Sequence, residues 1–469
     1  MIITQEKRKT LWHLSLHLLA IAVKKLYPQA KLGNGQVTDE GFFYDFDNLT
    51  IKTSDLTLIQ DEMKKLIDEG INCENILLSV QQALDFFCNE PYKLQILERI
   101  EKTEKISLCS IGDFYDICSQ NHSDKCSNLI AVKLLSIGGA YWMGNPKNQM
   151  LTRISGIAFE NQEALGEFIA YSELLKKHDH RVIGKQLELF SFHPQAPGSV
   201  FWHENGLILR NLIVSYWRKV HRKNGFREIS TPILLDSSLW KQSGHWELYK
   251  ESMYTTQIEE KEYAIKPMSC PGSILYYLEK NRSYRDLPLK VAELGLVHRN
   301  ELSGTLHGLM RVRQFTQDDA HIFVCPNQLS EQIQQVIKMS VDMIGQFGFK
   351  NFSFAVSVRS PEKMAKYLGD DADWDKAEAA LKSSLEALNY TYCISEGEAK
   401  FYGPSIDIMI NDCLGRKWQC STLQLDFNLP QRFELEYTDA HGEKQTPFML
   451  HRTLLGSLER FIGILLEHT

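Results

Sequence analysis

The sequence predicts a multidomain α+β protein, with an α+β domain first, a helical connector next and a domain built on a largely antiparallel sheet last. The first part combines a helix-period stretch with short β-prone pieces. Residues 162–188 are rich in Glu, Leu, Lys and Ala and contain few helix breakers. After the Pro-rich break at 194–198, helical stretches alternate with short apolar runs that are typical of strands.

The first domain is expected to span residues 1–161. Over residues 5–27 apolar side chains recur at helical spacing, which predicts a helix with His13 and His17 one turn apart on a shared face. Residues 33–46 place turn glycines around short β-prone pieces, and a second helical pattern runs from Leu56 to Glu69. This mixture favours an α+β domain.

Residues 162–193 are expected to form a helical linker and residues 194–469 a second domain. The pattern over 162–188 predicts one long helix with basic residues towards its end, including His180 and Arg181. In the second domain the runs 291–294, 408–410 and 423–427 predict strands.

Bulk properties exclude several classes of protein. The chain has 469 residues, 43% of them hydrophobic, and a formal net charge of −7, which argues against a protein that coats nucleic acid non-specifically. Its start lacks the uninterrupted apolar run of a signal peptide or a membrane span. Ten scattered cysteines without a close pair do not form a disulfide framework. We therefore expect a soluble, cytoplasmic protein.

Residues 297–323 carry an unusual mixture of charges. A solvated hairpin would account for one Arg–Glu pair, but Arg299, Arg311 and Arg313 are interleaved with apolar residues and lie close to Glu301. This pattern favours a half-buried strand that presents cations. Guanidinium groups bind phosphate oxygens bidentately, so the stretch predicts a phosphate-binding site.

Three ordered motifs in this half resemble the signatures of class II aminoacyl-tRNA synthetases. Residues 225–232 (GFREISTP) are similar to the first, dimer-interface signature, and residues 298–301 (HRNE) with 311–315 (RVRQF) to the second. Residues 451–460 (HRTLLGSLER) are similar to the third. The surrounding sequence resembles threonyl-tRNA synthetases over most of the chain. The resemblance implies a class II antiparallel-sheet catalytic domain preceded by an α+β editing domain.

For the nucleotide, the resemblance implies catalytic roles for Arg299 on the α-phosphate of ATP and Arg460 on the γ-phosphate. It implies further that Glu301 lies near the adenine amino group, that Phe315 stacks on adenine, and that ATP enters with Mg²⁺. Arg311 and Gln419 complete the implied ATP-binding set. Fixed cations suit this chemistry because negative charge develops on the phosphate oxygens during attack at the α-phosphorus.

Cys270, His321 and His451 are far apart in the sequence, and each alone would more often be structural. The resemblance implies that together they hold one zinc ion per catalytic domain. Three protein ligands leave a position for a substrate hydroxyl, which would favour threonine over valine. The implied amino-acid-binding residues are Gln317, Asp319, Tyr402 and Gln424. His245 is implied to act catalytically near the transfer to the tRNA terminus.

The amino-terminal histidines alone predict little, because a pair at i and i+4 usually belongs to an ordinary amphipathic helix. Together with Cys118-x-x-x-His122, they resemble the pocket of threonyl and alanyl synthetase editing domains. The resemblance implies hydrolysis of seryl-tRNA by a set that comprises His13, His17, Lys93, Asp116, Cys118 and His122. The ligand types suit zinc, yet they also suit general acid–base chemistry. We expect no permanent second zinc.

The sequence also departs from the family's usual pattern. It begins at the editing helix and ends just after the third signature, so the resemblance implies a short form without the small amino-terminal domain and the carboxyl-terminal anticodon-binding domain. Ser273 stands where a histidine is usual, Ser405 where a lysine is usual and Ser421 where a glycine is usual. Residues 119–121 (SQN) replace Arg-Gly-Pro in the editing motif.

The leading hypothesis is a homodimeric ligase that activates L-threonine as threonyl-adenylate and transfers it to the acceptor end of threonine tRNA. Editing of seryl-tRNA would be an additional activity. One alternative is a paralogue that passes threonine to a non-tRNA acceptor such as a carrier protein. The other is a non-catalytic tRNA-binding regulator.

Overall fold

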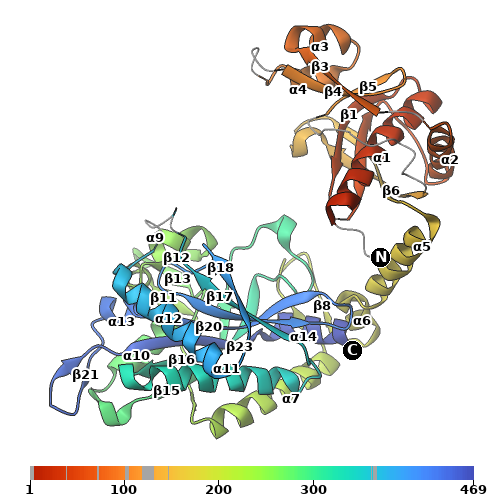
Figure 1. The fold of residues 1–469 in the computed structure, drawn as a ribbon. Coiled ribbons are helices and arrows are strands. Elements are labelled where there is room, and N and C mark those ends of the chain that lie inside the picture. Colours follow the sequence, from red (N-terminus) through yellow and green to blue (C-terminus); the bar gives the residue numbers. More distant parts are fainter. Residues whose placement is uncertain are drawn as a thin grey trace. The chain divides into compact units, whose positions relative to one another are not determined.

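A computed structural model of the protein shows two compact units, residues 1–174 and 175–469 (Figure 1). The structure describes residues 5–38, 40–70, 73–100, 105–118, 131–145, 147–360, 362 and 367–469. None of the helices in these ranges combines the length and apolar character that a membrane crossing requires. The predicted domain boundaries after residues 161 and 193 stay predictions.

The amino-terminal unit is an α+β domain, as the sequence predicts. Its main sheet has the strand order β1-β2-β7-β6, and every neighbouring pair is antiparallel. Helix α1 (Gln5–Leu26) packs on this sheet and on α2 (Asp55–Asp68), which confirms both predicted helices. A second sheet has the order β3-β4-β5. The remaining elements are β1 (Lys31–Val37), β2 (Phe42–Asp47), β3 (Cys73–Ser79), α3 (Val80–Phe86), α4 (Pro91–Leu97), β4 (Lys105–Ile111), β5 (Phe114–Ile117), β6 (Ala131–Tyr141) and β7 (Met150–Phe159).

The single helix predicted over 162–188 is wrong, because the chain forms two helices there. Helix α5 (Gln162–Lys177) ends before Asp179, whose backbone is extended, and α6 (His180–Gln186) begins directly after it. The Asp179 carboxylate accepts a hydrogen bond from the Arg181 amide at 2.8 Å. This N-cap satisfies an amide that would otherwise lack an intrahelical partner, so it favours a new helix start over continuation.

The second unit is built on an eight-stranded sheet of order β10-β15-β16-β23-β20-β19-β17-β18. Only the outermost pairs, β10 with β15 and β17 with β18, are parallel, so the predicted largely antiparallel sheet is confirmed. The strands are β10 (Arg227–Glu228), β15 (Leu289–His298), β16 (Gln314–Val324), β17 (Phe352–Val358), β18 (Tyr392–Glu396), β19 (Ser405–Asn411), β20 (Lys417–Asp426) and β23 (Phe448–Ser457).

Four long helices pack around this sheet. Helices α11 (Leu329–Gly345) and α12 (Asp371–Ala387) contact each other, and both lie on the sheet (Figure 1). Helix α14 (Leu458–His468) contacts β16, β23 and α6, and α7 (Glu204–Lys223) leads into β10. The smaller elements are β8 (Phe190–Ser191), β9 (Phe201–Trp202), β11 (Leu234–Asp236), α8 (Ser237–Gln242), α9 (His245–Tyr249), β12 (Tyr254–Ile258), β13 (Lys261–Ile265), α10 (Cys270–Leu278), β14 (Arg282–Ser283), α13 (Asn428–Arg432), β21 (Tyr437–Thr438) and β22 (Lys444–Gln445).

The half-buried strand expected to carry Arg311 and Arg313 is not formed. Strand β15 ends at His298 and β16 begins only at Gln314, so the arginines lie in the connecting loop. Arg313 binds this loop itself, since its Nε donates to the Glu301 carbonyl at 2.9 Å and its Nη2 to Ser303 Oγ at 3.1 Å. These hydrogen bonds within the loop hold Arg313 out of a strand, although the local pattern favours one.

Candidate active site

Strand β16 is the central element of the site. Phe315, Gln317, Asp319 and His321 occupy alternate positions on it, and alternate side chains of a strand point to one face. Phe315 and Gln317 line one pocket, Gln317 and Asp319 line a second, and His321 belongs to a cluster of metal-binding side chains. One strand face therefore runs through the whole site.

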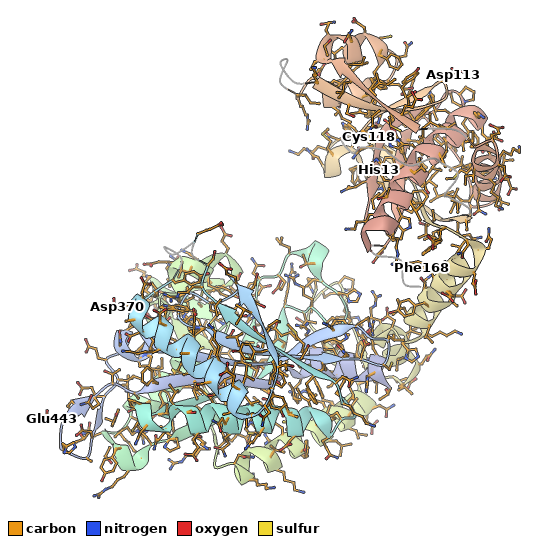
Figure 2. All side chains as sticks on the ribbon, in the orientation of Figure 1. His13, Asp113, Cys118, Phe168, Asp370 and Glu443 are labelled. Atoms are coloured by element: carbon orange, nitrogen blue, oxygen red, sulfur yellow. The ribbon has the colours of Figure 1, made fainter. Side chains whose placement is uncertain are left out.

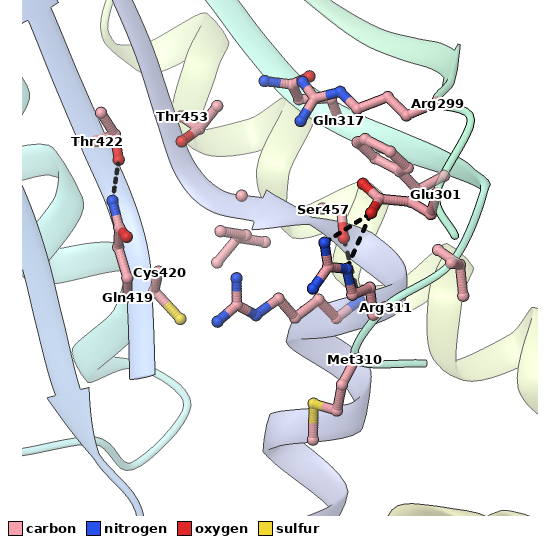
Figure 3. Close-up of a pocket in the computed structure, with 15 residues that line it drawn as sticks. Arg299, Glu301, Met310, Arg311, Gln317, Gln419, Cys420, Thr422, Thr453 and Ser457 are labelled. Atoms are coloured by element: carbon pink, nitrogen blue, oxygen red, sulfur yellow. Dashed lines mark hydrogen bonds and ion pairs between the residues drawn. The ribbon is translucent and has the colours of Figure 1, made fainter. Parts of the chain in front are cut away.

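The first pocket is a cavity of ≈ 520 Å³ that collects the predicted nucleotide-binding residues, namely Arg299, Glu301, Arg311, Phe315, Gln419 and Arg460. Figure 3 shows Glu301 and Arg311 joined on one side, at 2.8 Å, and Gln419 with Thr422 on the other. The Arg299 guanidinium lies 5.1 Å from the centre of the Phe315 ring. Arg460 Nε is buried and has no hydrogen-bond partner among the described residues. The unpaired Arg460 Nε and the half-buried Phe315 ring in the cavity wall suit an anionic, planar ligand.

The second pocket, of ≈ 360 Å³, collects the predicted amino-acid-binding residues. Asp319, Tyr402 and Gln424 line it together with His245, Cys270 and His451. Tyr402 Oη donates to Gln424 Oε1 at 2.8 Å. Burial raises the pKa of Asp319 to about 7. The two pockets share Arg299, Gln317, Thr422 and Thr453, so they adjoin.

Cys270, His321 and His451 form a compact group. One ligand atom of each lies within 4.8 Å of the others. Cys270 opens α10, and the two histidines face each other across the β16–β23 pair. All three side chains are buried, at 6%, 1% and 6% relative exposure. The fold thus brings together three residues whose sequence spacing gives no sign of a shared site.

The hydrogen bonds around this group fit a zinc ion. Ser273 Oγ lies 2.8 Å from His321 Nδ1, while His321 Nε2 is buried without a hydrogen-bond partner among the described residues. Burial lowers the pKa of His321 well below its ordinary value, so the ring is neutral, and the tautomer that donates from Nδ1 to Ser273 Oγ would offer the Nε2 lone pair to a metal. Asp426 Oδ2 lies 2.8 Å from His451 Nε2. Partners of this kind orient the ligand histidines of zinc sites.

His245 lies at the start of α9 and is buried. Its Nδ1 lies 2.8 Å from Ser243 Oγ, and its Nε2 has no hydrogen-bond partner in the described part of the chain. Burial, with further contributions from His451 and Arg432, lowers the pKa of His245 to about 3. The ring is therefore neutral at physiological pH, and one nitrogen is available to a ligand in the second pocket.

In the amino-terminal unit, five of the six predicted editing residues come together. His13 Nε2 lies 3.0 Å from Cys118 Sγ and 3.3 Å from His17 Nε2, and Figure 2 shows His13 and Cys118 next to each other. Asp116 lies 3.1 Å from His17 Nδ1 and 2.5 Å from Lys93 Nζ. Burial raises the pKa of Asp116, but Lys93 and His17 outweigh it and hold this pKa far below its usual range. The sixth residue, His122, lies outside the described residues.

Comparison with known proteins identifies the family. The profile of the tRNA synthetase class II core domain (G, H, P, S and T) matches residues 254–469. The threonine–tRNA ligase of Caldanaerobacter subterraneus subsp. tengcongensis is 50% identical over 467 residues, which cover 99% of this chain and 72% of that protein. This chain belongs to the threonine–tRNA ligase family. The ligase of Acetivibrio thermocellus, 49% identical over 97% of this chain and 72% of its own length, is a second relative.

Solved structures of the family agree with this assignment. The RNA binding domain of threonyl-tRNA synthetase from Cryptosporidium parvum Iowa II is 43% identical, with a TM-score of 0.60 over 62% of this chain and 72% of that one. A putative threonyl-tRNA synthetase, ThrRS-1 of Aeropyrum pernix, is 33% identical, with a TM-score of 0.55 over 62% and 69%. The class II core and the family's architecture are therefore present in this chain.

The third family signature contains a bulge that the sequence did not predict. Gln317 pairs with Ser457 but Asp319 pairs with Thr453, so three residues of β23, 454–456, lie opposite Asp318 alone, two more than in a regular ladder. Their three amides donate to the buried Asp318 carboxylate at 2.9, 3.0 and 3.0 Å. Burial raises the pKa of Asp318 to about 6. The bulge directs the chain into α14, where Ser457 Oγ caps the helix by accepting from the Arg460 amide.

Sequence reasoning missed several residues of the two sites. Thr422 and Thr453 line both pockets, and Tyr44 Oη donates to Asp116 at 2.8 Å in the amino-terminal cluster. The threonines occupy alternate strand positions beside Gln424 and His451, so strand alternation next to the signature residues could have indicated them. Tyr44 shows no such sign, because a buried aromatic residue in a strand is ordinary.

Proposed function

We propose that this chain activates L-threonine with ATP to form threonyl-adenylate and transfers threonine to the acceptor end of threonine tRNA. The observation that carries this proposal is the pair of adjoining pockets, one lined by guanidinium groups and one opening on Cys270, His321 and His451. They share Arg299 and Gln317, so a reaction that joins the ligands of both pockets has a place to occur. A cytoplasmic location suits this reaction, because its ATP and tRNA substrates are there.

In the nucleotide pocket, Arg299 would hold the α-phosphate because it is common to both pockets. Phe315 would stack on adenine beside Glu301 and Arg311, and Arg460 would hold the γ-phosphate, with Gln419 on the opposite wall. Mg²⁺ would enter with ATP as its counter-ion. These fixed groups lower the barrier by positioning the phosphates and by stabilising the charge that develops on them.

In the amino-acid pocket, Cys270, His321 and His451 would hold one zinc ion. Zinc, when bound, supplies a Lewis acid that can accept the amino group and hydroxyl of threonine. Asp319 would accept a hydrogen bond from the amino group of the substrate, while Gln317, Tyr402 and Gln424 would fix the orientation of the substrate. Valine has no hydroxyl to offer, and a site built for a hydroxyl rejects such an analogue strongly.

His245 would take part in transfer to the tRNA. Its neutral ring and its unpaired Nε2 would accept a hydrogen bond from the ribose hydroxyl that attacks the adenylate and so orient that hydroxyl. Its place in the wall of the amino-acid pocket supports this role.

We also propose that the chain forms a homodimer through the first signature and α7. Leu207, Ile208 and Leu212 on this helix are 42%, 55% and 65% exposed. An apolar stripe of this kind is typical of an interaction surface. Light scattering on the purified protein should give twice the chain mass, and a monomer at micromolar concentration would contradict the proposal.

A second activity, hydrolysis of seryl-tRNA, is favoured by the amino-terminal cluster. Serine keeps the hydroxyl that zinc would recognise and lacks only a methyl group, a difference of about 1–3 kcal/mol, so selection in one pocket is insufficient. Asp116 contacts His17 Nδ1 and so orients this ring, whose Nε2 lies 3.3 Å from His13 Nε2, and His13 in turn lies 3.0 Å from Cys118 Sγ. A chain of polar groups of this kind supports proton transfer to and from a water. Purified protein should deacylate seryl-tRNA, and the His17→Ala variant should not.

We propose that this second activity uses acid–base chemistry without a second permanent zinc. Metal analysis should therefore give one zinc per chain, and two zinc ions per chain would contradict this proposal.

The decisive experiment measures threonine-dependent ATP–pyrophosphate exchange and charging of threonine tRNA and an acceptor-stem minihelix on the same preparation. Exchange with charging of either RNA supports the ligase. Exchange without charging would favour a paralogue that passes threonine to a carrier protein or another acceptor. Absence of both activities, with tRNA binding retained, would favour a non-catalytic regulator.

A further inference from the structure

His180, the first residue of α6, is completely buried and lies outside the three signatures. Its Nδ1 lies 2.6 Å from Glu467 Oε1, and its Nε2 accepts a hydrogen bond from the Leu309 amide at 2.9 Å. The backbone amide of His180 also donates to Glu467 Oε1, at 3.1 Å. Both ring nitrogens therefore have a partner, although His180 lines neither pocket of the site.

These two hydrogen-bond partners determine which nitrogen of the His180 ring carries the proton. Since Nε2 accepts from a backbone N–H, it carries a lone pair, and the proton must be on Nδ1, where it is donated to the carboxylate. The neighbouring Asp179 completes a group of three potential metal ligands. A metal would need one of the ring nitrogens, and both are engaged, so the arrangement is a hydrogen-bonded bridge.

One end of the bridge is the turn that carries Arg311. His307 accepts from the amides of Met310 at 2.9 Å and Arg311 at 3.2 Å, and it donates to the Arg311 carbonyl at 3.1 Å. Leu309 lies in the middle of this turn. Gly308, with a φ of +47°, lies so close to the His180 ring that a Cβ there would collide with Nε2. His180 thus contacts the turn at two consecutive residues.

The other end of the bridge is the helix that carries Arg460. Glu467 lies two helical turns after Arg460 on α14, is only 3% exposed, and pairs also with Arg416 at 2.7 Å. Met310 and Leu309 pack beside Gly463 of the same helix. The bridge through His180 therefore joins the backbone of the Arg311 turn to the helix of Arg460, and both guanidinium groups line the nucleotide pocket.

We propose that His180 is a positioning residue for nucleotide binding, which holds the Arg311 turn against α14 so that Arg311 and Arg460 face the same triphosphate. This rests on the proposed function in so far as the nucleotide pocket binds ATP. The amino-acid pocket receives no residue from the turn, so the effect of His180 is confined to the nucleotide.

Matched substitutions separate the two hydrogen bonds. In His180→Asn the shorter amide can replace Nδ1 and keep the bond to Glu467, but it cannot reach the Leu309 amide. In His180→Gln the amide oxygen reaches the position of Nε2 and can accept from Leu309. A control for general destabilisation is Leu385→Ala, which opens a cavity in α12 at a residue that lines neither pocket.

Equilibrium dialysis with Mg-ATP on the full chain measures the effect without requiring catalysis. We expect His180→Asn to weaken ATP binding about tenfold, which is about 1.4 kcal/mol, and His180→Gln to stay within about threefold of the original chain by the same scale. Leu385→Ala should bind ATP normally. In pyrophosphate exchange, the KM for ATP should rise in His180→Asn while the KM for threonine stays unchanged.

Unchanged ATP affinity in folded His180→Asn would overturn the inference. Equal losses in His180→Asn and Leu385→Ala would also overturn it, because both would then report stability alone. The proposed function fails separately: if the original chain binds ATP but shows no threonine-dependent exchange, the ligase proposal falls and the dialysis result still decides the role of His180.

Discussion

Ser273→Ala tests the metal site through a residue that does not touch the metal. Ser273 and His321 are both 1% exposed, and Ser273 Oγ lies 2.8 Å from His321 Nδ1. Without the hydroxyl, the Nδ1–H group is left buried and unpaired, which costs about 1–3 kcal/mol. The ring can escape this cost by moving its proton to Nε2, but that nitrogen is the proposed ligand. Either way zinc binding is weakened.

A cost of about 1–3 kcal/mol corresponds to a loss of about 5–150-fold in zinc affinity. This range includes the roughly 10–100-fold that is typical when the partner of a ligand histidine is removed. Ser273→Thr keeps the hydroxyl and is the matched control. Competition against a chromogenic chelator gives the affinities, and circular dichroism checks that each variant is folded.

A Ser273→Ala variant that binds zinc within twofold of the original chain would refute the reasoning. A result in which Ser273→Thr loses as much affinity as Ser273→Ala would refute it as well, because the hydroxyl would then be irrelevant. Both outcomes would leave His321 oriented by its burial between strands instead of by its hydrogen bond.

Three further predictions concern metal, pH and stability. Removal of zinc by a chelator should abolish threonine-dependent pyrophosphate exchange, and added zinc should restore it; exchange that survives in metal-free protein would contradict the site. Burial, with the nearby Arg452, lowers the pKa of His221 to about 2. In this pH range only the unfolded chain protonates the His221 ring. The free energy of unfolding should therefore fall as the pH falls below 6.5, by about 1 kcal/mol between pH 6.5 and 5.5. Urea unfolding of the His221→Gln variant should show a shallower pH dependence. Lys266 Nζ lies 2.8 Å from the buried Glu293 carboxylate, so Lys266→Met would leave this carboxylate without a cation. The substitution should lower the free energy of unfolding by about 3–5 kcal/mol. A change below about 1 kcal/mol in urea unfolding would argue against this pairing.

Local patterns in the sequence predicted much of the fold. Apolar periodicity, which records burial directly, predicted helices α1 and α2 and the strands around 291–294, 408–410 and 423–427. The break between α5 and α6 comes from the Asp179 cap, a local signal that the prediction of one long helix overlooked. The turn before β16 is held by the hydrogen bond from Leu309 to His180, and no window of neighbouring residues can identify that distant partner.

The candidate site was harder to predict from residue patterns alone than the fold. Arg299, Arg311 and Glu301 form a dense local cluster, so their charge pattern predicts a phosphate site. Cys270, His321 and His451 meet only because β16 pairs with β23 and α10 begins beside them, which a list of spacings cannot reveal. The family resemblance supplied that grouping, and the geometry is compatible with it. The roles of the individual residues stay predictions until they are tested.

The bulge at residues 454–456 divides the third signature into two parts that can change separately. His451 precedes the bulge and lines the proposed amino-acid pocket, whereas Arg460 follows it and lines the proposed nucleotide pocket. Because Asp318 fixes the bulge by its own hydrogen bonds, a substitution that reshapes the strand around His451 need not shift the helix of Arg460. Such a joint would allow the lining of the pocket at His451 to change its shape while the residues that α14 contributes to the other pocket keep their places.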